Sequence, residues 1–412
     1  MRCGLIGEKL GHSHSKTLHG LLADYRYDLI ELAPEELGPF LKKGEFDGLN
    51  VTIPYKQAVI PYLRELSPTA QAIGSVNTIV RRPDGTLFGD NTDAYGLGVI
   101  TGRAGMAFAG TKTLILGSGG TSRTARHVVE AAGGEAVTVS RTGETNYENL
   151  ERHADAAWLI NATPVGMYPR AQAAPVDLAR LTNLRGVADV IYNPLRTRLL
   201  QQAQDLGIPC ANGLRMLVAQ AKAAAEHFLG APLPDAGTDR VYGELAREMR
   251  SLALIGMPSC GKTTLGRLLA AHMGRELVDL DEKIARDAGL SIPEIFAREG
   301  ETGFRARETA ALREVAGRQG LVVATGGGIV KNPENVRLLR ANAAVCFVQR
   351  GLARLSSADP SRPLSTSAEA LARMYAERLP LYTAAADFSV SNDGAAEETA
   401  RAIEDQFKEM CR

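Results

Sequence analysis

The stretch from Gly256 to Thr264 constrains the fold more than any other part of this chain. It reads Gly-Met-Pro-Ser-Cys-Gly-Lys-Thr-Thr and matches the phosphate-binding pattern Gly-x-x-x-x-Gly-Lys-[Ser/Thr]. An apolar run at 251–255 predicts a buried strand before it, and apolar residues at helical spacing from Leu265 to Met273 predict a helix after it. In this context, backbone N–H groups and the positive end of the helix bind phosphate.

Individual residues of this loop have predicted roles. Lys262 is expected to reach between the β- and γ-phosphates, and the Thr263 hydroxyl can bind Mg²⁺. The other residues expected to bind ATP are Ser259, Cys260, Gly261 and Thr264. The alternative is a glycine-rich turn with a surface lysine, which the flanking strand and helix disfavour.

Length and charge limit the remaining possibilities. The chain has 412 residues and a hydrophobic content of 45%, which is enough for two or three domains with a core each. Lys+Arg and Asp+Glu number 47 each, so we expect no nucleic-acid partner and no anionic membrane surface, and no apolar run has the length of a membrane span. Five scattered cysteines without a Cys-x-x-Cys pair predict reduced thiols and a cytoplasmic protein.

The first 92 residues alternate short β-like runs with amphipathic segments, which predicts an α/β domain. The expected strands are 2–7, 27–32, 48–51 and 78–82, and the amphipathic segments are 17–25, 35–43 and 57–66.

Polar clusters fall at the ends of the expected strands, where α/β proteins bind ligands. They are Gly11–Ser15, Asn50–Lys56, Ser75–Thr78 and Asp90–Asp93. Together they provide hydroxyls, amides, an ammonium group and carboxylates, which suit a polyhydroxylated acid. Helix capping by Ser13, Thr52 and Asp93 is the alternative for each cluster alone. A metal site at His12, His14 and His19 is disfavoured because no carboxylate has suitable spacing.

A second nucleotide-binding pattern begins after Gly110. A strand at 113–116, a glycine-rich turn at 117–123, a helix to Ala132 and a strand at 136–140 predict a βαβ unit, although Ser122 occupies the third glycine position of the fingerprint. Arg141 follows the second strand, where a carboxylate would bind the ribose 2′-hydroxyl of NAD, and offers a cation for a 2′-phosphate. The sequence therefore predicts NADP, with a surface arginine as the alternative.

Further strands are predicted at 157–162 and 186–191, and a helix from Asn212 is predicted to end near Leu229. Two prolines and two glycines between Gly230 and Asp239 predict a linker.

The motifs of residues 1–230 resemble, in type and order, those of the shikimate dehydrogenase family. They are Ser-x-Ser, Asn-Val-Thr-x-Pro-x-Lys, Val-Asn-Thr, Gly-Asp-Asn-Thr-Asp and Gly-x-Gly-Gly-x-x-Arg. The resemblance implies that Lys56 and Asp93 form the catalytic pair. It implies that the substrate is bound by Ser13, Ser15, Asn50, Thr52, Asn77, Tyr192 and Gln220. It also implies that NADP is bound by Gly117, Ser118, Gly119, Gly120, Thr121, Ser140, Arg141, Thr142, Val190 and Gly213.

Residues 251–412 resemble the shikimate kinase family, whose members are P-loop kinases of the nucleoside monophosphate kinase type. The motifs are Asp279-Leu-Asp281, Gly303-Phe-Arg-Ala-Arg-Glu308, the glycines 326–328, Arg362-Pro-Leu and Arg378-Leu-Pro-Leu-Tyr382. The resemblance implies that Asp281 binds the reacting hydroxyls, that Arg305 and Arg378 bind the carboxylate, that Gly327 contacts the ring and that Arg362 binds ATP phosphates. Asp279 is expected to bind Mg²⁺ together with Thr263. Arginine forks suit a carboxylate, and an aspartate can accept the proton of an attacking hydroxyl.

The two resemblances together imply a bifunctional enzyme that uses NADP(H), ATP and Mg²⁺ to reduce 3-dehydroshikimate to shikimate and then phosphorylate it. The expected domains are a substrate domain at 1–103, a Rossmann domain at 104–212, a helix at 213–230 that packs back on the substrate domain, a linker at 231–250 and a kinase domain at 251–412. Two alternatives remain open: a first half that binds ligand without catalysis, and a dehydrogenase that also accepts quinate.

Overall fold

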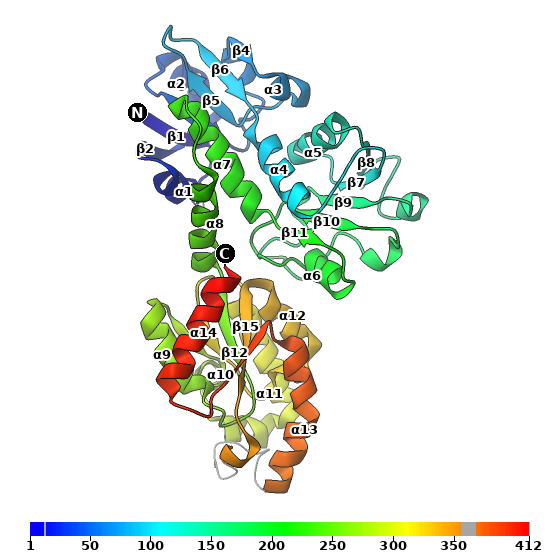
Figure 1. Cartoon of the computed structure of the whole chain (residues 1–412), viewed down its shortest axis with the longest axis vertical. Helices are drawn as coiled ribbons and strands as arrows, with labels where there is room; N and C mark the ends of the chain where they lie inside the picture. Colours follow the sequence, from blue (N-terminus) through cyan, green and yellow to red (C-terminus); the bar gives the residue numbers. More distant parts are fainter. Residues whose placement is uncertain (12–13, 356–367, 412) are drawn as a thin grey trace. The chain divides into compact units, whose positions relative to one another are not determined.

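The structure is a computed structural model that describes residues 1–11, 14–355 and 368–411. Two predicted site residues, Ser13 and Arg362, lie outside the described residues, as does His12 of the disfavoured metal site. The chain divides into two units, one of residues 1–192 and 197–242, the other of residues 193–196 and 243–412. Three sheets flanked by helices (Figure 1) confirm the predicted α/β class.

The first unit begins with a mixed sheet of order β2-β1-β3-β5-β6-β4. Its strands are β1 Arg2–Gly7, β2 Arg26–Glu31, β3 Gly48–Val51, β4 Glu65–Leu66, β5 Thr78–Arg81 and β6 Leu87–Asp90. β1 pairs parallel with β3, and Ile6 lies opposite Val51. The polar segments that follow these two strands are therefore brought to the same edge of the sheet.

The amphipathic pattern of residues 57–66 suggested a helix, and this prediction is wrong. The segment forms turns, the 3-10 helix η2 Ile60–Tyr62 and the strand β4. Pro61 explains the difference, because proline donates no backbone hydrogen bond and disfavours the α conformation of the residue before it. Lys56 lies within the turn segment of residues 53–59 that precedes η2.

The second sheet of the first unit is entirely parallel and has the order β11-β10-β9-β7-β8. Its strands are β7 Lys112–Leu116, β8 Glu135–Val139, β9 Trp158–Asn161, β10 Gly186–Asp189 and β11 Cys210–Ala211. Leu114, Leu159 and Val187 are fully buried, as expected for parallel strands covered on both faces. Because the strands are parallel, the turns after β7, β9 and β10 lie at one edge of the sheet.

Helices α4 and α7 join the two sheets. α7 packs on α4 and also contacts α1, β3 and β5, while α4 contacts α5, β10 and β11. The helices of the unit are α1 Ser15–Leu22, α2 Leu37–Lys43, α3 Pro68–Ile73, α4 Thr92–Arg103, α5 Gly120–Ala131, α6 Arg198–Asp205 and α7 Leu214–Leu229, with η1 Pro34–Glu36, η3 Leu150–His153 and η4 Leu178–Arg180.

The predicted linker is helical over most of its length, so that prediction is wrong from Asp235 onward. Helix α8 spans Asp235–Met249. Pro234 immediately before it is compatible with a helix start, since the first helical N–H groups need no partner within the helix. Lys222 Nζ of α7 lies 2.9 Å from Asp235 Oδ1, and the guanidinium of Arg215 lies 3.7 Å from the centre of the Tyr242 ring. These contacts hold the first turns of α8 on α7.

The second unit contains a parallel sheet of order β13-β14-β12-β15-β16. Its strands are β12 Ser251–Ile255, β13 Leu277–Asp279, β14 Val322–Ala324, β15 Ala343–Gln349 and β16 Phe388–Ser391. The helices are α9 Lys262–Met273, α10 Leu280–Ala288, α11 Ile292–Ala316, α12 Pro333–Asn342, α13 Ala368–Ala385 and α14 Ala396–Met410, with η5 Ile329–Lys331 and η6 Leu352–Arg354. α9 packs with α14, and α11 packs with α12 (Figure 1). The central strand β12 runs into the glycine-rich loop and α9, as the sequence predicts.

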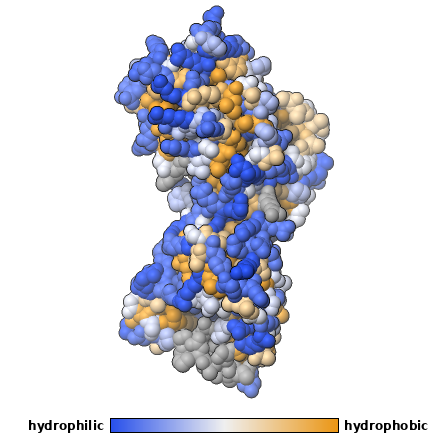
Figure 2. Space-filling model, turned by 60° about the vertical axis from the view of Figure 1, so that its left-hand side comes forward, coloured by the Kyte–Doolittle hydropathy of each residue, from blue (hydrophilic) through white to orange (hydrophobic). Residues whose placement is uncertain are grey.

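Hydrophilic residues cover most of the face shown in Figure 2, and hydrophobic residues form separate smaller areas on it. Within the described parts of the chain, no helix has the length and apolar character needed to cross a membrane.

Candidate active sites

A cavity of about 560 Å³ lies in the first unit and is lined by segments of both sheets and by α7. It brings together many of the predicted residues: Ser15, Asn50, Thr52, Lys56, Asn77, Asp93, Thr121, Val190, Tyr192, Gly213 and Gln220. Gly11 and Val51, which belong to the predicted polar clusters, also line it, as do residues that the sequence did not indicate: Leu5, Lys9, Leu10, Met216 and Leu217. Most of these are apolar, and their sequence pattern is that of ordinary core positions.

Lys56 and Asp93 form an ion pair in this cavity. Lys56 Nζ donates to Asp93 Oδ2 at 2.5 Å, and Asn77 Nδ2 donates to Asp93 Oδ1 at 2.9 Å. Asn77 is itself fixed, because its Oδ1 accepts a hydrogen bond from the backbone N–H of Thr92 at 2.8 Å. The lysine side chain is 29% exposed, so a ligand can reach the ammonium group. The carboxylate of Asp93 thus holds Lys56, which argues against the alternative that Asp93 serves only as a helix cap.

The side-chain amide of Asn50 is held by a hydrogen bond from Tyr27, whose ring stacks on His19. The Tyr27 hydroxyl donates to Asn50 Oδ1 at 2.7 Å, and the ring of His19 stacks on Tyr27 with 4.0 Å between centroids. Burial lowers the pKa of His19 to about 3, so its ring is neutral. No group of three or more His, Cys, Asp or Glu that could hold a metal ion occurs among the described residues, and His19 is part of the core.

The glycine-rich turn after β7 fits a dinucleotide phosphate. Gly117 has a φ of 108°, and the Ser122 hydroxyl donates to its carbonyl at 2.6 Å, so serine closes the turn where a glycine was expected. A Cβ on Gly119 or Gly120 would meet no atom within 4 Å, which leaves the backbone at the start of α5 open to a ligand.

Most of the residues predicted to bind NADP lie outside the cavity. Thr121, Val190 and Gly213 line it, whereas the others follow the adjoining ends of β7 and β8. Arg141 is exposed directly after β8, between the half-buried Ser140 and the exposed Thr142. An extended dinucleotide suits this arrangement, because its two ends occupy different places at the edge of a parallel sheet.

A cavity of about 580 Å³ surrounds the glycine-rich loop of the second unit. The predicted residues that line it are Ser259, Gly261, Lys262, Thr263, Thr264, Asp279, Asp281, Arg305, Gly327 and Arg378. Cys260 does not line it, because its thiol is fully buried, so only its backbone can contribute to a phosphate site. Arg350 lines the cavity and was not indicated by the sequence.

The loop has a backbone shaped for phosphate. Lys262 Nζ donates to the carbonyls of Gly256 at 3.0 Å and Met257 at 2.9 Å, so the lysine lies along the loop. Ser259 adopts a φ of 63°, a conformation that costs a non-glycine residue about 1 kcal/mol. Asn392 donates to the carbonyl of Cys260 at 2.8 Å and supports the loop from the end of β16, a role that the sequence did not reveal.

Thr263 and Asp279 form the expected pair for a divalent cation. The Thr263 hydroxyl donates to Asp279 Oδ2 at 2.7 Å. Asp279 Oδ1 accepts the backbone N–H groups of Asp281 and Glu282 at 3.0 and 3.3 Å and so caps α10. A hydroxyl and a carboxylate oxygen beside a phosphate loop are ligands that suit Mg²⁺.

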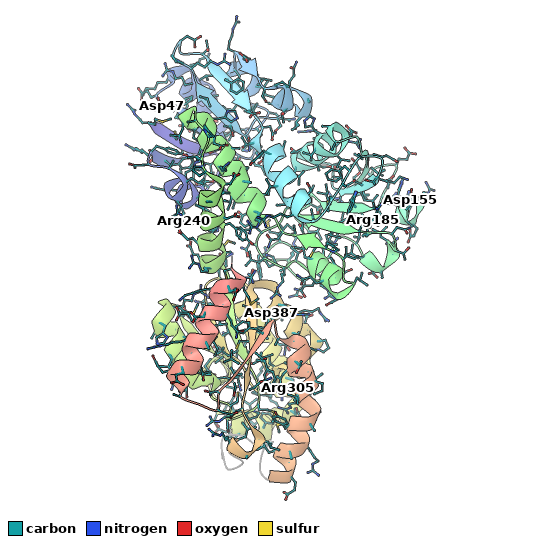
Figure 3. All side chains as sticks on the ribbon, viewed as in Figure 1. Asp47, Asp155, Arg185, Arg240, Arg305 and Asp387 are labelled. Atoms are coloured by element: carbon teal, nitrogen blue, oxygen red, sulfur yellow. The ribbon has the colours of Figure 1, made fainter. Side chains whose placement is uncertain are left out.

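Two arginines approach the same turn of glycines. Arg378 donates to the carbonyl of Gly327 at 2.9 Å, and the Tyr382 hydroxyl donates to the same carbonyl. Arg305 on α11, labelled in Figure 3, donates to Glu308 Oε2 at 3.0 Å. The Glu308 side chain is completely buried, and its burial raises its pKa while Arg305 opposes the rise. Glu308 was part of a quoted motif but had no predicted role; here it holds one guanidinium at the cavity.

The close packing explains why the turn consists of glycines. A Cβ on Gly328 would stand 2.1 Å from Arg305 Nη2, closer than real Cβ contacts permit. A side chain at this position would therefore displace the guanidinium from the cavity.

Two family models match the chain. The model of the shikimate dehydrogenase substrate binding domain matches residues 5–79, and the shikimate kinase model matches residues 258–408. The first match contains the residues of the first cavity from Leu5 to Asn77, and the second contains every residue that lines the second cavity.

Curated relatives cover the first unit. The shikimate dehydrogenase (NADP(+)) of Clostridium perfringens strain SM101 is 35% identical over 264 residues, which is 59% of this chain and 97% of the relative. That of Shouchella clausii is 37% identical over 257 residues, 55% of this chain and 92% of the relative.

Solved structures resemble the same part. A chorismate mutase/shikimate 5-dehydrogenase fusion protein of Clostridium acetobutylicum is 34% identical with a TM-score of 0.56, covering 59% of this chain and 96% of that one. The Thermus thermophilus shikimate 5-dehydrogenase in complex with NADP(H) and shikimate is 29% identical with a TM-score of 0.53, covering 58% and 98%. A quinate dehydrogenase of Corynebacterium glutamicum in complex with NAD is 27% identical with a TM-score of 0.53, covering 58% and 97%.

Proposed function

The chain belongs to the shikimate dehydrogenase family and ends in a shikimate kinase domain, and we propose how its two cavities perform the consecutive reactions of this bifunctional shikimate-pathway enzyme. The first unit reduces 3-dehydroshikimate to shikimate with NADPH, and the second phosphorylates shikimate to shikimate 3-phosphate with ATP. The observation that supports the residue assignment is that each unit holds its own cavity lined by charged and hydrogen-bonding groups of the predicted kinds.

In the first cavity, Lys56 would donate a proton to the carbonyl oxygen that is reduced. Asp93 would hold the ammonium group in position through its 2.5 Å hydrogen bond. Ser15, Asn50 and Thr52 offer hydroxyls and an amide to the carboxylate and hydroxyls of the substrate, and Ser13 is proposed for the same role. Asn77, Tyr192 and Gln220 would complete the set. NADPH, when bound along the turn from Gly117 to Thr121 and beside Arg141, supplies the hydride.

In the second cavity, Asp281 would accept the proton of the attacking hydroxyl. Arg305 and Arg378 would bind the substrate carboxylate with their planar guanidinium groups, and Gly327 would contact the ring. Lys262 and the loop N–H groups would bind the phosphates of ATP, as is proposed for Arg362, and Thr263 and Asp279 would hold Mg²⁺. Mg-ATP, when bound, supplies the phosphoryl group.

Quinate is a second candidate substrate of the first unit. The similarity to a quinate dehydrogenase favours testing it, and the additional tertiary hydroxyl of quinate needs the same kinds of hydrogen-bonding groups. Comparing kcat/KM for shikimate and quinate with NADP⁺ and with NAD⁺ decides the question. The substrates are small acids, and we propose the cytoplasm as the location because all five cysteines are free.

The proposed function is tested by following NADPH oxidation and ADP formation in one assay of the pure chain. With 3-dehydroshikimate, NADPH and Mg-ATP, both signals should appear, and ADP formation should require NADPH unless shikimate is supplied. NADPH oxidation without any ADP formation from shikimate would contradict the kinase assignment. ADP formation from shikimate without NADPH oxidation would leave the first unit as a ligand-binding module.

Replacing Arg141 with aspartate should raise KM for NADPH at least about tenfold, because a carboxylate repels the 2′-phosphate. KM for NADH should change little, since NADH lacks this phosphate. Arg141→Gln, which removes the cation without adding an anion, should fall between wild type and Arg141→Asp. Initial rates with the two cofactors provide the comparison. Equal losses with NADPH and NADH would show that Arg141 does not bind the 2′-phosphate.

A further inference from the structure

A buried carboxylate in the first unit has no part in the reactions proposed above. Asp189, the last residue of β10, is fully buried. Its Oδ1 accepts hydrogen bonds from Asn161 Nδ2 and from the backbone N–H of Ile191, both at 3.0 Å. Its Oδ2 accepts one from the Thr197 hydroxyl at 2.6 Å. Asp189 thus ties together three segments with hydrogen bonds that all point toward its oxygens.

The hydrogen bonds of Asp189 reach the two turns that follow neighbouring strands. Asn161 ends β9 directly opposite Asp189 in the parallel register. Its Oδ1 accepts both the backbone N–H and the hydroxyl of Thr163, at 3.1 and 2.7 Å, and so shapes the turn after β9. The N–H of Ile191 belongs to the turn after β10. The carboxylate therefore fixes both turns relative to each other at the ligand-binding edge of the sheet.

The turn after β10 forms one wall of the first cavity. Val190 and Tyr192, on either side of Ile191, both line that cavity. The N–H of Gly213 donates to the carbonyl of Ile191 at 3.0 Å, and a Cβ on Gly213 would stand only 1.9 Å from the carbonyl oxygen of Val190. The start of α7, which carries Gln220 into the cavity, is thus seated on the same turn. A shift of residues 190–192 would move cavity groups on both elements.

The hydrogen bonds suit the ionised form of Asp189. A carboxylate only accepts, and the Asn161 amide N–H and the Ile191 N–H can only donate to it. If Asp189 were protonated on Oδ2, the Thr197 hydroxyl could reverse and accept that proton, but the hydrogen bonds from Asn161 and Ile191 would then go to a neutral group and would be roughly half as strong. Burial raises the pKa of Asp189 to about 7, and the three hydrogen bonds limit the rise. The elements packed against β10 carry six charged or titratable side chains among the described residues: Asp93, Tyr95, Arg103, Arg198, Asp205 and Cys210. None of the six is a cause of the raised pKa of Asp189.

We propose that ionised Asp189 is a positioning residue of the dehydrogenase reaction, which holds the 190–192 turn against the cavity, and that its protonation loosens this wall. The inference rests on the proposed reduction in the first unit. It adds a group that touches neither substrate nor cofactor but makes their binding surface depend on pH.

Thr197→Val tests the proposal, because it removes one hydrogen bond to the carboxylate while keeping the shape of the side chain. The loss should raise the pKa of Asp189 by roughly one unit. Near pH 7 the ionised fraction would then fall from about a half to about a tenth, so kcat/KM for shikimate oxidation should be roughly fivefold below wild type. At about pH 9, where Asp189 is mostly ionised in both proteins, the difference should shrink to less than about twofold.

Thr197→Ser is the matched control, since it keeps the hydroxyl, and it should follow wild type at both pH values. The pH dependence separates positioning from helix capping, because Thr197 also accepts the N–H of Leu200 at 3.3 Å at the start of α6. A loss of the same size at both pH values would leave Thr197 with only the capping role and overturn the proposal.

A measurement on the intact wild-type chain covers the case in which Thr197→Val does not fold. Carbon NMR of protein labelled at the aspartate carboxyls should show one signal that titrates near pH 7 and is missing in Asp189→Asn. The absence of such a signal would overturn the proposal. If wild type itself fails to oxidise shikimate while this signal is present, the failure lies with the proposed function and not with the charge state of Asp189.

Discussion

Replacing Lys56 with alanine is expected to lower the rate of 3-dehydroshikimate reduction by about 10²–10⁴-fold, the range typical for the loss of a general acid. Its ammonium group lies in the first cavity, 2.5 Å from the carboxylate of Asp93. Lys9 also lines this cavity, but its side chain is exposed, so we do not expect Lys9 to replace Lys56 as the proton donor. NADPH oxidation under saturating substrate measures the loss.

Phosphorylation of shikimate by the same variant should stay within about twofold of wild type, because Lys56 does not line the second cavity. Lys42→Ala is a suitable control, since Lys42 is an exposed lysine on α2 of the same unit, and it should leave both activities unchanged. A Lys56→Ala variant that still reduces 3-dehydroshikimate at a tenth of the wild-type rate or more would exclude Lys56 as the proton donor.

Local sequence patterns predicted the strands well where a run of apolar residues ends in a polar motif. The expected strands at 2–7, 48–51 and 251–255 have the bounds observed for β1, β3 and β12. Each is buried along most of its length and is followed by a polar segment that reaches a cavity. In such strands, burial and the change to polar residues mark the same boundary, so the pattern contains the information that is needed.

One error arose where a local signal outweighed another, and a second arose where the stabilising contacts come from a different helix. The amphipathic pattern of residues 57–66 favours a helix, but Pro61 prevents it. Between residues 230 and 239 the prolines and glycines suggested a linker, yet α8 begins at Asp235 because Lys222 and Arg215 of α7 hold its first turns. That stabilisation comes from another helix, and no window of local sequence contains it.

In the candidate sites too, local motifs revealed some residues, whereas others depend on contacts between distant segments. The motifs identified residues that carry charge or hydroxyl groups, such as Lys56 and Asp281, because their chemistry is specific. They did not identify Asn392, which supports the phosphate loop from a segment 132 residues away in sequence. They gave no role to Glu308, whose importance depends on complete burial beside Arg305. Such supporting residues are recognisable only after distant segments have been brought together in the fold.

Replacing Lys262 with alanine is expected to lower the kinase rate by about 10²–10³-fold, the loss typical when a group that stabilises transferring charge is removed. Lys262 is a buried cation beside the phosphate loop, and it lines the second cavity with Thr263 and Asp281. Reduction of 3-dehydroshikimate should remain within about twofold of wild type, because every residue that lines the first cavity belongs to the first unit. ADP formation with added shikimate measures the kinase rate.

An equimolar mixture of Lys56→Ala and Lys262→Ala then tests whether the two cavities work independently. Each cavity is lined wholly by its own unit, and shikimate is a small acid that diffuses freely, so the shared chain need not guide it from one site to the next. The mixture, with each active site at its wild-type concentration, should convert 3-dehydroshikimate to shikimate 3-phosphate with the lag and steady rate of the intact enzyme. Unlabelled shikimate added to the wild-type reaction should dilute a labelled intermediate fully. A clearly shorter lag for the intact enzyme, together with incomplete dilution of the label, would show that shikimate passes directly between the sites.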